Sequence, residues 1–223
     1  MDGAETSEGR VAAWNVNATA VSYLVQAAAE HDITIVHVSS DYVFDGTREP
    51  HTEDEPFSPL GVYAQSKAAG DIAVSLAPKH YLLRSSWVVG DGPNFVRTML
   101  GLGAKGIAPS VVADQVGRLT FTGELVKIID HLLSNGAPYG TYNASNGGEP
   151  ASWADITRAI FQDAGYDLAV TDTTTAEYYK GKSGIAPRPL KSTLSLDKLQ
   201  ATGFKPTDWR EDLANYIAKE KQS

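Results

Sequence analysis

Helical and strand-like stretches alternate along this chain, and the strand-like stretches are almost wholly apolar. Residues 33–38 (ITIVHV) are mostly β-branched, which is typical of a strand buried on both faces of a parallel sheet. An amphipathic helical pattern over 11–30 precedes this strand. A second helical pattern over 63–76 follows it and is closed by Pro78. The alternation predicts an α/β fold with a parallel sheet.

The later part of the chain continues this alternation. The sequence predicts a strand over 81–89, helices around 95–100 and 125–133, and a strand at 141–144. The capping-box spacing of Ser152 and Asp155 then predicts the start of a further helix. A long loop is expected over 171–192, followed by two short helices that begin near Ser195 and Asp208. No internal repeat or low-complexity tract interrupts the order.

Composition narrows the class of protein. Of the 223 residues, 42% are hydrophobic and 21% are charged, so we expect a packed globular core. The net charge of −8 disfavours a nucleic acid polymer or an anionic membrane as a partner. Cysteine is absent and no apolar run is long enough to span a bilayer, so a cytoplasmic protein is expected. The histidines are scattered without the spacing of zinc ligands, so no metal site is predicted.

One short segment carries candidate chemistry. Tyr63 and Lys67 lie four residues apart at the start of a predicted helix, and therefore on one of its faces. A nearby ammonium lowers the pKa of a phenol, which would make Tyr63 a usable general acid. Ser39 or Ser40, at the end of the preceding strand, would orient a carbonyl opposite Tyr63. Such a set suits carbonyl reduction; the alternative is a surface tyrosine beside a solvated lysine. We interpret Asp41 and Asp45 as turn or capping residues.

Residues 36–71 (VHVSSDYVFDGTREPHTEDEPFSPLGVYAQSKAAGD) resemble the active-site segment of the extended short-chain dehydrogenases/reductases. More narrowly, they resemble the dTDP-4-dehydrorhamnose reductases. The likeness continues through residues 82–100, 111–126, 140–156 and 186–199, so it covers nearly the whole chain. It implies a Rossmann-like parallel sheet with a smaller C-terminal substrate-binding α/β region.

The resemblance also implies roles for particular residues. Ser40, Tyr63 and Lys67 would form the catalytic set, and Tyr63 and Lys67 would also contact the cofactor. The positions expected to line or approach the sugar-nucleotide pocket are Tyr42, Trp87, Asn94 and Gln115. Arg188, which lies between two prolines, is predicted to bind a phosphate of the substrate, with a structural salt bridge as the alternative.

The glycine fingerprint of dinucleotide-binding folds is missing from its usual place between a strand and a helix. The literal match GLGAKG, at 101–106, has the wrong context. Either the chain binds no dinucleotide, or it is the later part of a longer enzyme. The resemblance favours the second interpretation, and we expect the chain to be inactive alone. Residues 1–90 would hold the C-terminal part of a Rossmann-like domain with the catalytic segment. Residues 91–223 would be mainly substrate-binding and would return to the sheet near 139–144.

The function implied by the resemblance is reduction of a sugar-nucleotide ketone. NADPH, or NADH, would serve to reduce C4 of dTDP-4-dehydro-6-deoxy-L-mannose to give dTDP-L-rhamnose, a step in dTDP-rhamnose biosynthesis for cell wall polysaccharide. The alternative is a non-catalytic binding subunit that resembles the regulatory subunit of methionine adenosyltransferase. A related epimerase would use the same Tyr–Lys pair. The expected partner is a dTDP-sugar, and a homodimer is left open.

Overall fold

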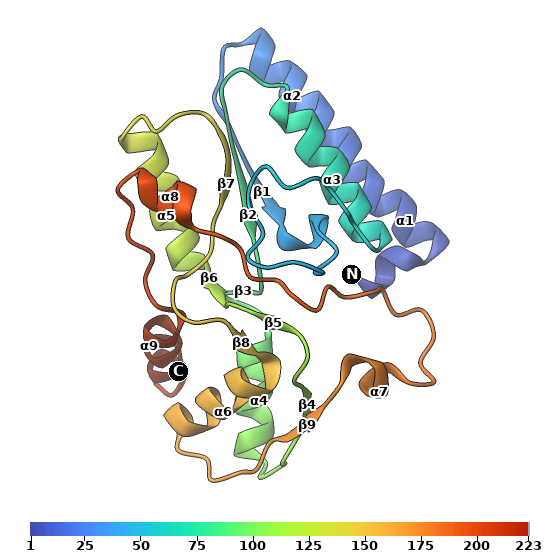
Figure 1. Ribbon diagram of the computed structural model, residues 1–223, viewed down its shortest axis with the longest axis vertical. Coiled ribbons are helices and arrows are strands. Elements are labelled where there is room, and N and C mark those ends of the chain that lie inside the picture. Colours follow the sequence, from blue (N-terminus) through green and yellow to red (C-terminus); the bar gives the residue numbers. More distant parts are fainter. Residues whose placement is uncertain (223) are drawn as a thin grey trace.

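The computed structural model describes residues 1–222, and the alternation of elements expected from the sequence is present (Figure 1). The helices are η1 (Asp2–Glu5), α1 (Ser7–Trp14), η2 (Asn15–Thr19), α2 (Ala20–Glu30), η3 (Asp41–Val43), α3 (Val62–Ser75), α4 (Phe95–Ala104), α5 (Thr122–Ser134), α6 (Trp153–Ala164), α7 (Thr175–Tyr179), α8 (Asp197–Ala201) and α9 (Trp209–Glu220). The strands are β1 (Ile35–Ser40), β2 (His80–Ser85), β3 (Val88–Val89), β4 (Ser110–Val112), β5 (Val116–Gly117), β6 (Thr120–Phe121), β7 (Gly140–Asn143), β8 (Ala151–Ser152) and β9 (Thr171–Thr173).

A parallel sheet of order β1-β2-β7 forms the centre of the larger region. The register pairs Ser40 with Ser85 and Arg84 with Asn143, so the carboxyl ends of the three strands meet at one edge of the sheet. Among the described residues, β1 has a paired strand on one side only. The predicted α/β class and parallel sheet are confirmed.

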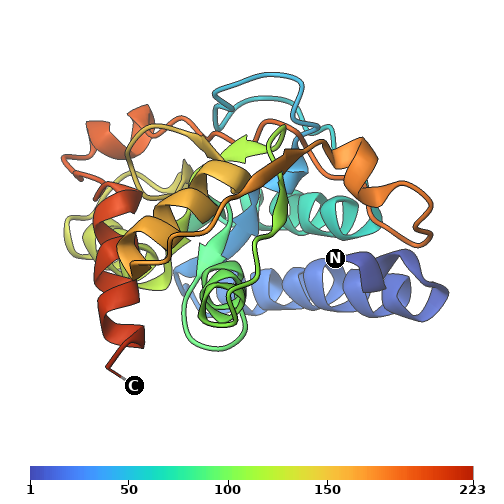
Figure 2. The same ribbon diagram turned by 90° about the horizontal axis from the view of Figure 1, so that it is seen from below.

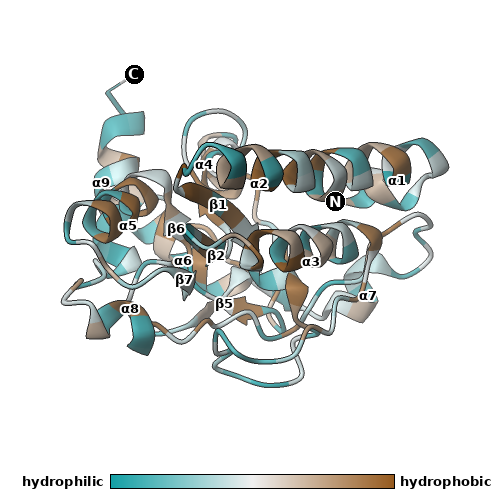
Figure 3. Cartoon of the chain, turned by 90° about the horizontal axis from the view of Figure 1, so that it is seen from above, coloured by the Kyte–Doolittle hydropathy of each residue, from teal (hydrophilic) through white to brown (hydrophobic). Residues whose placement is uncertain are grey.

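Alternate residues of the central strand face opposite helical layers, as the two-residue period of a strand requires. Leu82 packs against Val21 of α2 and Val74 of α3. Its neighbour Leu83 packs on the other side against a cluster that includes Ile128 of α5. The hydrophobic strands β1 and β2 therefore lie between helices (Figure 3), which explains why their sequences are apolar on both faces.

The helix predicted over 11–30 is longer and less regular than expected. It runs from Ser7 to Glu30 as α1, η2 and α2, and η2 is a single π-helical turn. This rod lies beside α3 (Figures 1 and 2). The approach is closest at Gly70 of α3, where an added Cβ would lie 2.1 Å from the carbonyl oxygen of Asn17. Only a glycine permits this contact.

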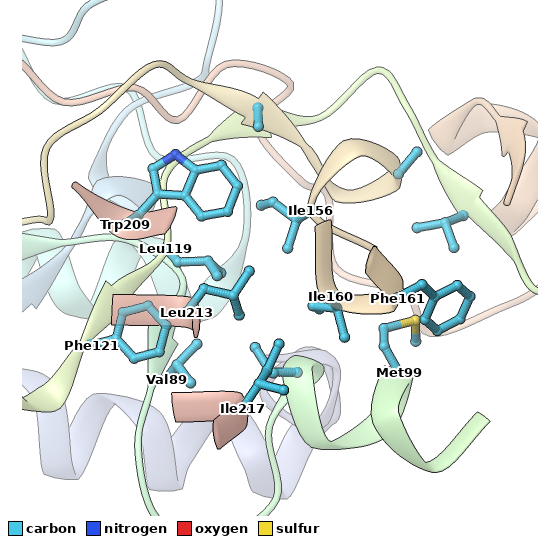
Figure 4. Packing of buried hydrophobic residues seen from close by; sticks show 14 residues of the cluster. Val89, Met99, Leu119, Phe121, Ile156, Ile160, Phe161, Trp209, Leu213 and Ile217 are labelled. Carbon is cyan, nitrogen blue, oxygen red and sulfur yellow. The ribbon is translucent and has the colours of Figure 1, made fainter. Parts of the chain in front are cut away.

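The smaller region lies beyond the carboxyl ends of β1 and β2 and has its own core (Figure 4). Helices α4, α6 and α9 and short strand pairs surround that core. Its larger buried side chains are Met99, Leu119, Phe121, Ile156, Ile160, Phe161, Trp209, Leu213 and Ile217. The predicted capping box is confirmed, because Ser152 and Asp155 cap each other at the start of α6.

Two predictions about local structure are wrong. The strand expected over 81–89 breaks into β2 and β3, since Trp87 adopts a left-handed backbone conformation with φ of 44°. The loop expected over 171–192 contains β9, which pairs with β4, and the short helix α7, which Thr174 caps. Both elements depend on partners remote in the sequence or on a local cap. The division of the chain between residues 90 and 91 stays a prediction.

No helix within the described residues is long and apolar enough to cross a membrane.

Candidate active site

Ser40 lies at the carboxyl end of β1, where the strand gives way to the short helix η3. Its hydroxyl oxygen accepts a hydrogen bond from the backbone N–H of Tyr42 at 3.1 Å. The same hydroxyl donates to Oδ1 of Asp41 at 3.0 Å. Both contacts fix the position of the Ser40 side chain in the edge of the sheet where ligands of parallel α/β proteins bind.

Tyr63 lies in the first turn of α3 and faces the same cavity as Ser40. The start of this helix is held by a distant acid, because the backbone N–H of Val62 donates to Oε1 of Glu5 at 2.9 Å. Burial and the neighbouring charge of Asp41 raise the pKa of Tyr63, although the Ser40 hydroxyl opposes the shift. The expectation of a lowered pKa for Tyr63 is therefore wrong.

Lys67 follows one helical turn after Tyr63 but is turned toward the sheet. Its side chain is buried, and Nζ donates to the backbone carbonyl of Val38 at 2.7 Å. Burial lowers the pKa of Lys67, and the charge of Asp71 partly offsets this effect. Lys67 does not line the cavity that Ser40 and Tyr63 share. The alternative of a solvated surface lysine is excluded by this burial.

The cavity that contains Ser40 and Tyr63 has a volume of about 460 Å³, and we call it the reaction cavity. Trp87 forms part of its wall, and its indole stacks on that of Trp153, with ring centroids 3.8 Å apart and an interplanar angle of 19°. Tyr42 lies on the same wall, with its ring edge-on to that of Tyr63 at 6.4 Å. The reaction cavity is therefore lined by the hydroxyls of Ser40 and Tyr63 together with the aromatic rings of Tyr42, Trp87 and Trp153.

A second cavity of about 430 Å³ adjoins the reaction cavity and shares Tyr42 and Trp153 with it. Gln115 is buried in its wall, where it donates to the Thr175 hydroxyl at 2.9 Å and accepts from the Trp153 indole at 3.3 Å. Arg188 also lines this second cavity, and Nη2 donates to Oδ1 of Asp2 at 2.7 Å. The alternative role of Arg188, a structural salt bridge, is thus present.

Asn94 lines neither cavity, although its neighbour Phe95 lines both, so its place near the substrate pocket stays a prediction. Its Oδ1 accepts the backbone N–H of Arg97 at 3.0 Å and caps α4. Its Nδ2 donates to the Tyr216 hydroxyl at 2.8 Å and to the Gly90 carbonyl at 2.9 Å. All of these contacts are internal, so Asn94 organises a loop of the smaller region.

Sequence reasoning missed two residues of the site. Trp153 lies within the predicted helix start at Ser152 and Asp155 and carried no signal of its own, yet it lines both cavities. Asp41 was assigned a turn or capping role, yet its carboxylate is buried at the reaction cavity. The neighbouring assignment is confirmed for Asp45, which accepts from the backbone and hydroxyl of Thr47 in a turn. The position of Asp41 directly after Ser40 was the one available signal.

Beneath the site, a buried ion pair joins α3 to β2. The Arg84 guanidinium donates to Asp71 at 3.1 Å and stacks between the rings of Phe44 and Phe57. Burial raises the pKa of Asp71, and the hydroxyl of Ser39 and the charge of Arg84 oppose the increase. Within residues 1–222, no group of three or more His, Cys, Asp or Glu side chains is arranged to hold a metal ion.

The parallel α/β fold, with a serine at a strand end near a Tyr-x-x-x-Lys helix, is the arrangement expected of the short-chain dehydrogenase/reductase class. Comparison with known proteins makes the assignment narrower. The chain belongs to the family described as the RmlD substrate binding domain, which matches residues 1–222. The resemblance predicted from the sequence is confirmed.

Similar proteins have consistent names. The chain is 38% identical over 222 residues to the dTDP-4-dehydrorhamnose reductase of Aggregatibacter actinomycetemcomitans, covering 92% of this chain and 74% of the relative. It is 37% identical over 224 residues to the Mycolicibacterium smegmatis reductase, covering 98% of this chain and 67% of the relative.

Solved structures agree. The Bacillus anthracis dTDP-4-dehydrorhamnose reductase in complex with NADP has a TM-score of 0.87 and 33% identity, covering 98% of this chain and 76% of that one. The Clostridium acetobutylicum reductase has a TM-score of 0.90 and 36% identity, covering 99% and 77%. The chain thus spans about three quarters of the length of these reductases.

Proposed function

We propose that this chain carries the catalytic and substrate-binding part of a dTDP-4-dehydrorhamnose reductase. The reaction would reduce the C4 ketone of dTDP-4-dehydro-6-deoxy-L-mannose to give dTDP-L-rhamnose. The observation that carries this proposal is the single cavity that Ser40 and Tyr63 both line beneath the stacked Trp87 and Trp153 indoles. The names of the relatives and of the structural neighbours support the same reaction.

Each member of the catalytic set has a distinct role in this proposal. Ser40 orients the ketone oxygen, and Tyr63 donates its phenolic proton to that oxygen as hydride reaches C4. The phenol of Tyr63, whose pKa is raised by burial, is protonated at neutral pH, which is the state that a proton donor needs. The ammonium of Lys67 lies one helical turn from Tyr63 and donates to the Val38 carbonyl. It would stabilise the phenolate formed after proton transfer by turning from that carbonyl toward the phenol.

The two adjoining cavities suit the two parts of a sugar nucleotide. Tyr42 and Trp87 would contact the sugar in the reaction cavity. Gln115 would hydrogen-bond the nucleotide in the second cavity. Arg188 would exchange its contact with Asp2 for a phosphate, which a planar guanidinium binds in a bidentate manner. The flat indole of Trp153 would also suit stacking on a ring of the sugar nucleotide.

The residues of the chain fit one end of a nicotinamide cofactor. When bound, NADPH (or NADH) supplies the hydride. The ammonium of Lys67 and the phenol of Tyr63 have the donor chemistry to hold ribose hydroxyls. For the pyrophosphate the chain offers little, since the GLGAKG segment over 101–106 covers the end of α4 rather than a turn that opens a helix.

We therefore propose that the chain alone binds NADPH weakly and turns over slowly. Calorimetric titration of the chain with NADPH should show no binding in the micromolar range. The same chain should still bind dTDP-L-rhamnose, because both cavities lie within the described residues. Micromolar affinity for NADPH would contradict this proposal.

Tyr63→Phe tests the catalytic assignment. Turnover is to be measured after the corresponding N-terminal portion of the Clostridium acetobutylicum reductase is joined ahead of residue 1. We expect Tyr63→Phe to lower kcat by at least about a hundredfold, because the proton donor is lost. Affinity for dTDP-L-rhamnose should stay within severalfold.

Tyr23→Phe is the matched control, since Tyr23 lies exposed on α2 and touches neither cavity. Undiminished turnover by Tyr63→Phe would refute the assignment.

A further inference from the structure

Asp41 lines the reaction cavity but has no part in the proposed reaction. Its side chain is buried at 3% exposure, and Oδ1 accepts the Ser40 hydroxyl at 3.0 Å. The other carboxylate oxygen, Oδ2, is buried and makes no hydrogen bond of normal geometry among the described residues, although the Ser192 hydroxyl lies near enough to lower the pKa of the carboxyl. A buried carboxylate oxygen without such a bond is unfavourable for folding, so a use at the neighbouring cavity is the explanation to test.

The groups that face Asp41 come from several elements. Ser40 ends β1, and Ser192 lies in the segment that precedes α8. His51, fully buried, lies in the loop between η3 and α3. Burial raises the pKa of Asp41 to about 6, although the hydroxyls of Ser192 and Ser40 and the charge of His51 lower it. Tyr63, from α3, lines the same cavity as Asp41.

The charge of Asp41 also acts on the phenols of Tyr42 and Tyr63. The charge of Asp41 is, after burial, the next cause that raises the pKa of Tyr42 and of Tyr63. The carboxylate therefore acts electrostatically on the residue that we propose as the proton donor.

Ser40 has a single hydroxyl proton, and this proton is already used. In the structure the Ser40 oxygen accepts from the Tyr42 N–H and the Ser40 hydroxyl donates to Asp41. While Asp41 is ionised, Ser40 therefore has no proton to offer a ketone. Once Asp41 is protonated, its O–H can donate to the Ser40 oxygen, and the Ser40 proton is released toward the cavity. The rearrangement moves no electron pair and needs only one proton from solvent.

We propose that Asp41 is a positioning residue that switches Ser40 from donating to the carboxylate to donating to the substrate ketone. This inference rests on the roles proposed above for Ser40 and Tyr63. The reductase works best in the state in which Asp41 holds a proton and Ser40 polarises the ketone. Above the pH at which Asp41 ionises, the ketone loses that hydrogen bond and only Tyr63 remains to act on it.

The kinetic test is the pH dependence of kcat in the same chimeric enzyme. In the unmodified enzyme, kcat should fall by roughly tenfold or more between about pH 5.5 and pH 8, as the loss of one positioned donor predicts. Asp41→Asn should abolish this dependence, because the amide does not titrate. Ser40→Ala should also abolish it and leave a low kcat at every pH, because no hydroxyl remains to be redirected.

The Ser40→Ala variant also separates Asp41 from other titrating groups. A dependence that arises from His51 or Lys67 would persist in both variants, and that result would overturn the proposal. A double variant should behave as Ser40→Ala alone, since Asp41 acts only through Ser40.

A second measurement needs no turnover and uses the chain itself. With aspartate labelled at the carboxyl carbon, one NMR signal should titrate near pH 6 and be missing in Asp41→Asn. In Ser40→Ala this midpoint should move to higher pH, because the carboxylate loses a donated hydrogen bond. Asp45→Asn, in a turn that does not contact Ser40, should leave it unchanged. The proposal would be overturned if the Asp41 signal, the one missing in Asp41→Asn, titrates near pH 4. It would also be overturned if Ser40→Ala does not move the midpoint of that signal.

The failure of this inference is distinguishable from failure of the proposed function. If Tyr63→Phe abolishes turnover while Asp41→Asn keeps the pH dependence of the unmodified enzyme, only the switch is refuted. If Tyr63→Phe leaves turnover undiminished, the proposed reaction itself is refuted.

Discussion

Tyr63 holds its proton more firmly than a free tyrosine does, although a lysine lies one turn away on the same helix. The reason is the direction of that lysine, whose Nζ is bound to the carbonyl of Val38. The charge that most raises the pKa of the phenol, after burial, is instead the carboxylate of Asp41. The spacing of Tyr63 and Lys67 was readable from the sequence. The direction of the pKa shift of Tyr63 was not readable from the sequence. It depends on burial and on the positions of Lys67 and Asp41, which only the folded chain fixes.

At this scale, Asp41→Asn should stabilise the protein above neutral pH. The carboxyl has a pKa of about 6 in the folded protein and an ordinary value of 3.8, so the folded state retains the proton as the pH rises from 4 to 6. Stability conferred by this group is therefore lost as the pH rises through 6. Near pH 8 the variant should gain about 1–3 kcal/mol over the unmodified chain, and near pH 4 the gain should disappear.

Urea unfolding of both proteins at the two pH values measures this difference. A variant that is less stable than the unmodified chain at pH 8 would show that the ionised carboxylate is held favourably after all.

Among the elements, the helix that carries Tyr63 and Lys67 is the best predicted and the strand breaks are the worst. The helix α3 begins and ends within one residue of the predicted range because its apolar period and Pro78 are local signals. The strand β1 is displaced by two residues, to Ile35–Ser40, since its length is set by pairing with β2 rather than by hydrophobicity. The break at Trp87 has no sequence signal, because a tryptophan rarely adopts a positive φ.

Gly70→Ala tests how tightly the elements position α3. The added methyl would lie 2.1 Å from the Asn17 carbonyl oxygen, a backbone atom that cannot move away freely. We expect the free energy of unfolding to fall by about 1–3 kcal/mol, and affinity for dTDP-L-rhamnose to fall as α3 shifts.

Gly101→Ala, in α4, is the matched control because a Cβ there meets no atom within 4 Å. It should stabilise the chain by about 0.5–1 kcal/mol, as alanine does in a helix interior. Equal effects of the two substitutions in denaturant titrations would contradict the packing described here.

At the scale of the whole molecule, apolar side chains are exposed on the helical rod that precedes β1. Val11, Val16, Tyr23 and Leu24 are each at least 60% exposed, and β1 has one unpaired edge within the described residues. Apolar surface and an open strand edge both favour association with another chain. The overall arrangement of sheet and smaller region was predictable from the alternation of elements, whereas the distribution of exposed surface required the structure.

We therefore expect the chain alone to self-associate in a concentration-dependent way, which size-exclusion chromatography with light scattering would detect. Leu24→Lys should reduce the association, because it places a charge on the exposed face of α2 without removing a buried contact. Val126→Lys, at an equally exposed position on α5, should not reduce it. A strictly monomeric chain at high concentration would refute this expectation.

The stacked indoles of Trp87 and Trp153 have a consequence for how the two halves of a ligand are sensed. One face of the pair borders the chamber with the reactive hydroxyls, and Trp153 also borders the chamber with Gln115 and Arg188. The pair is a partition that both compartments share. Because the indoles are stacked, we expect an occupant that tilts Trp153 to shift Trp87 as well, so that filling one compartment would alter the shape of its neighbour.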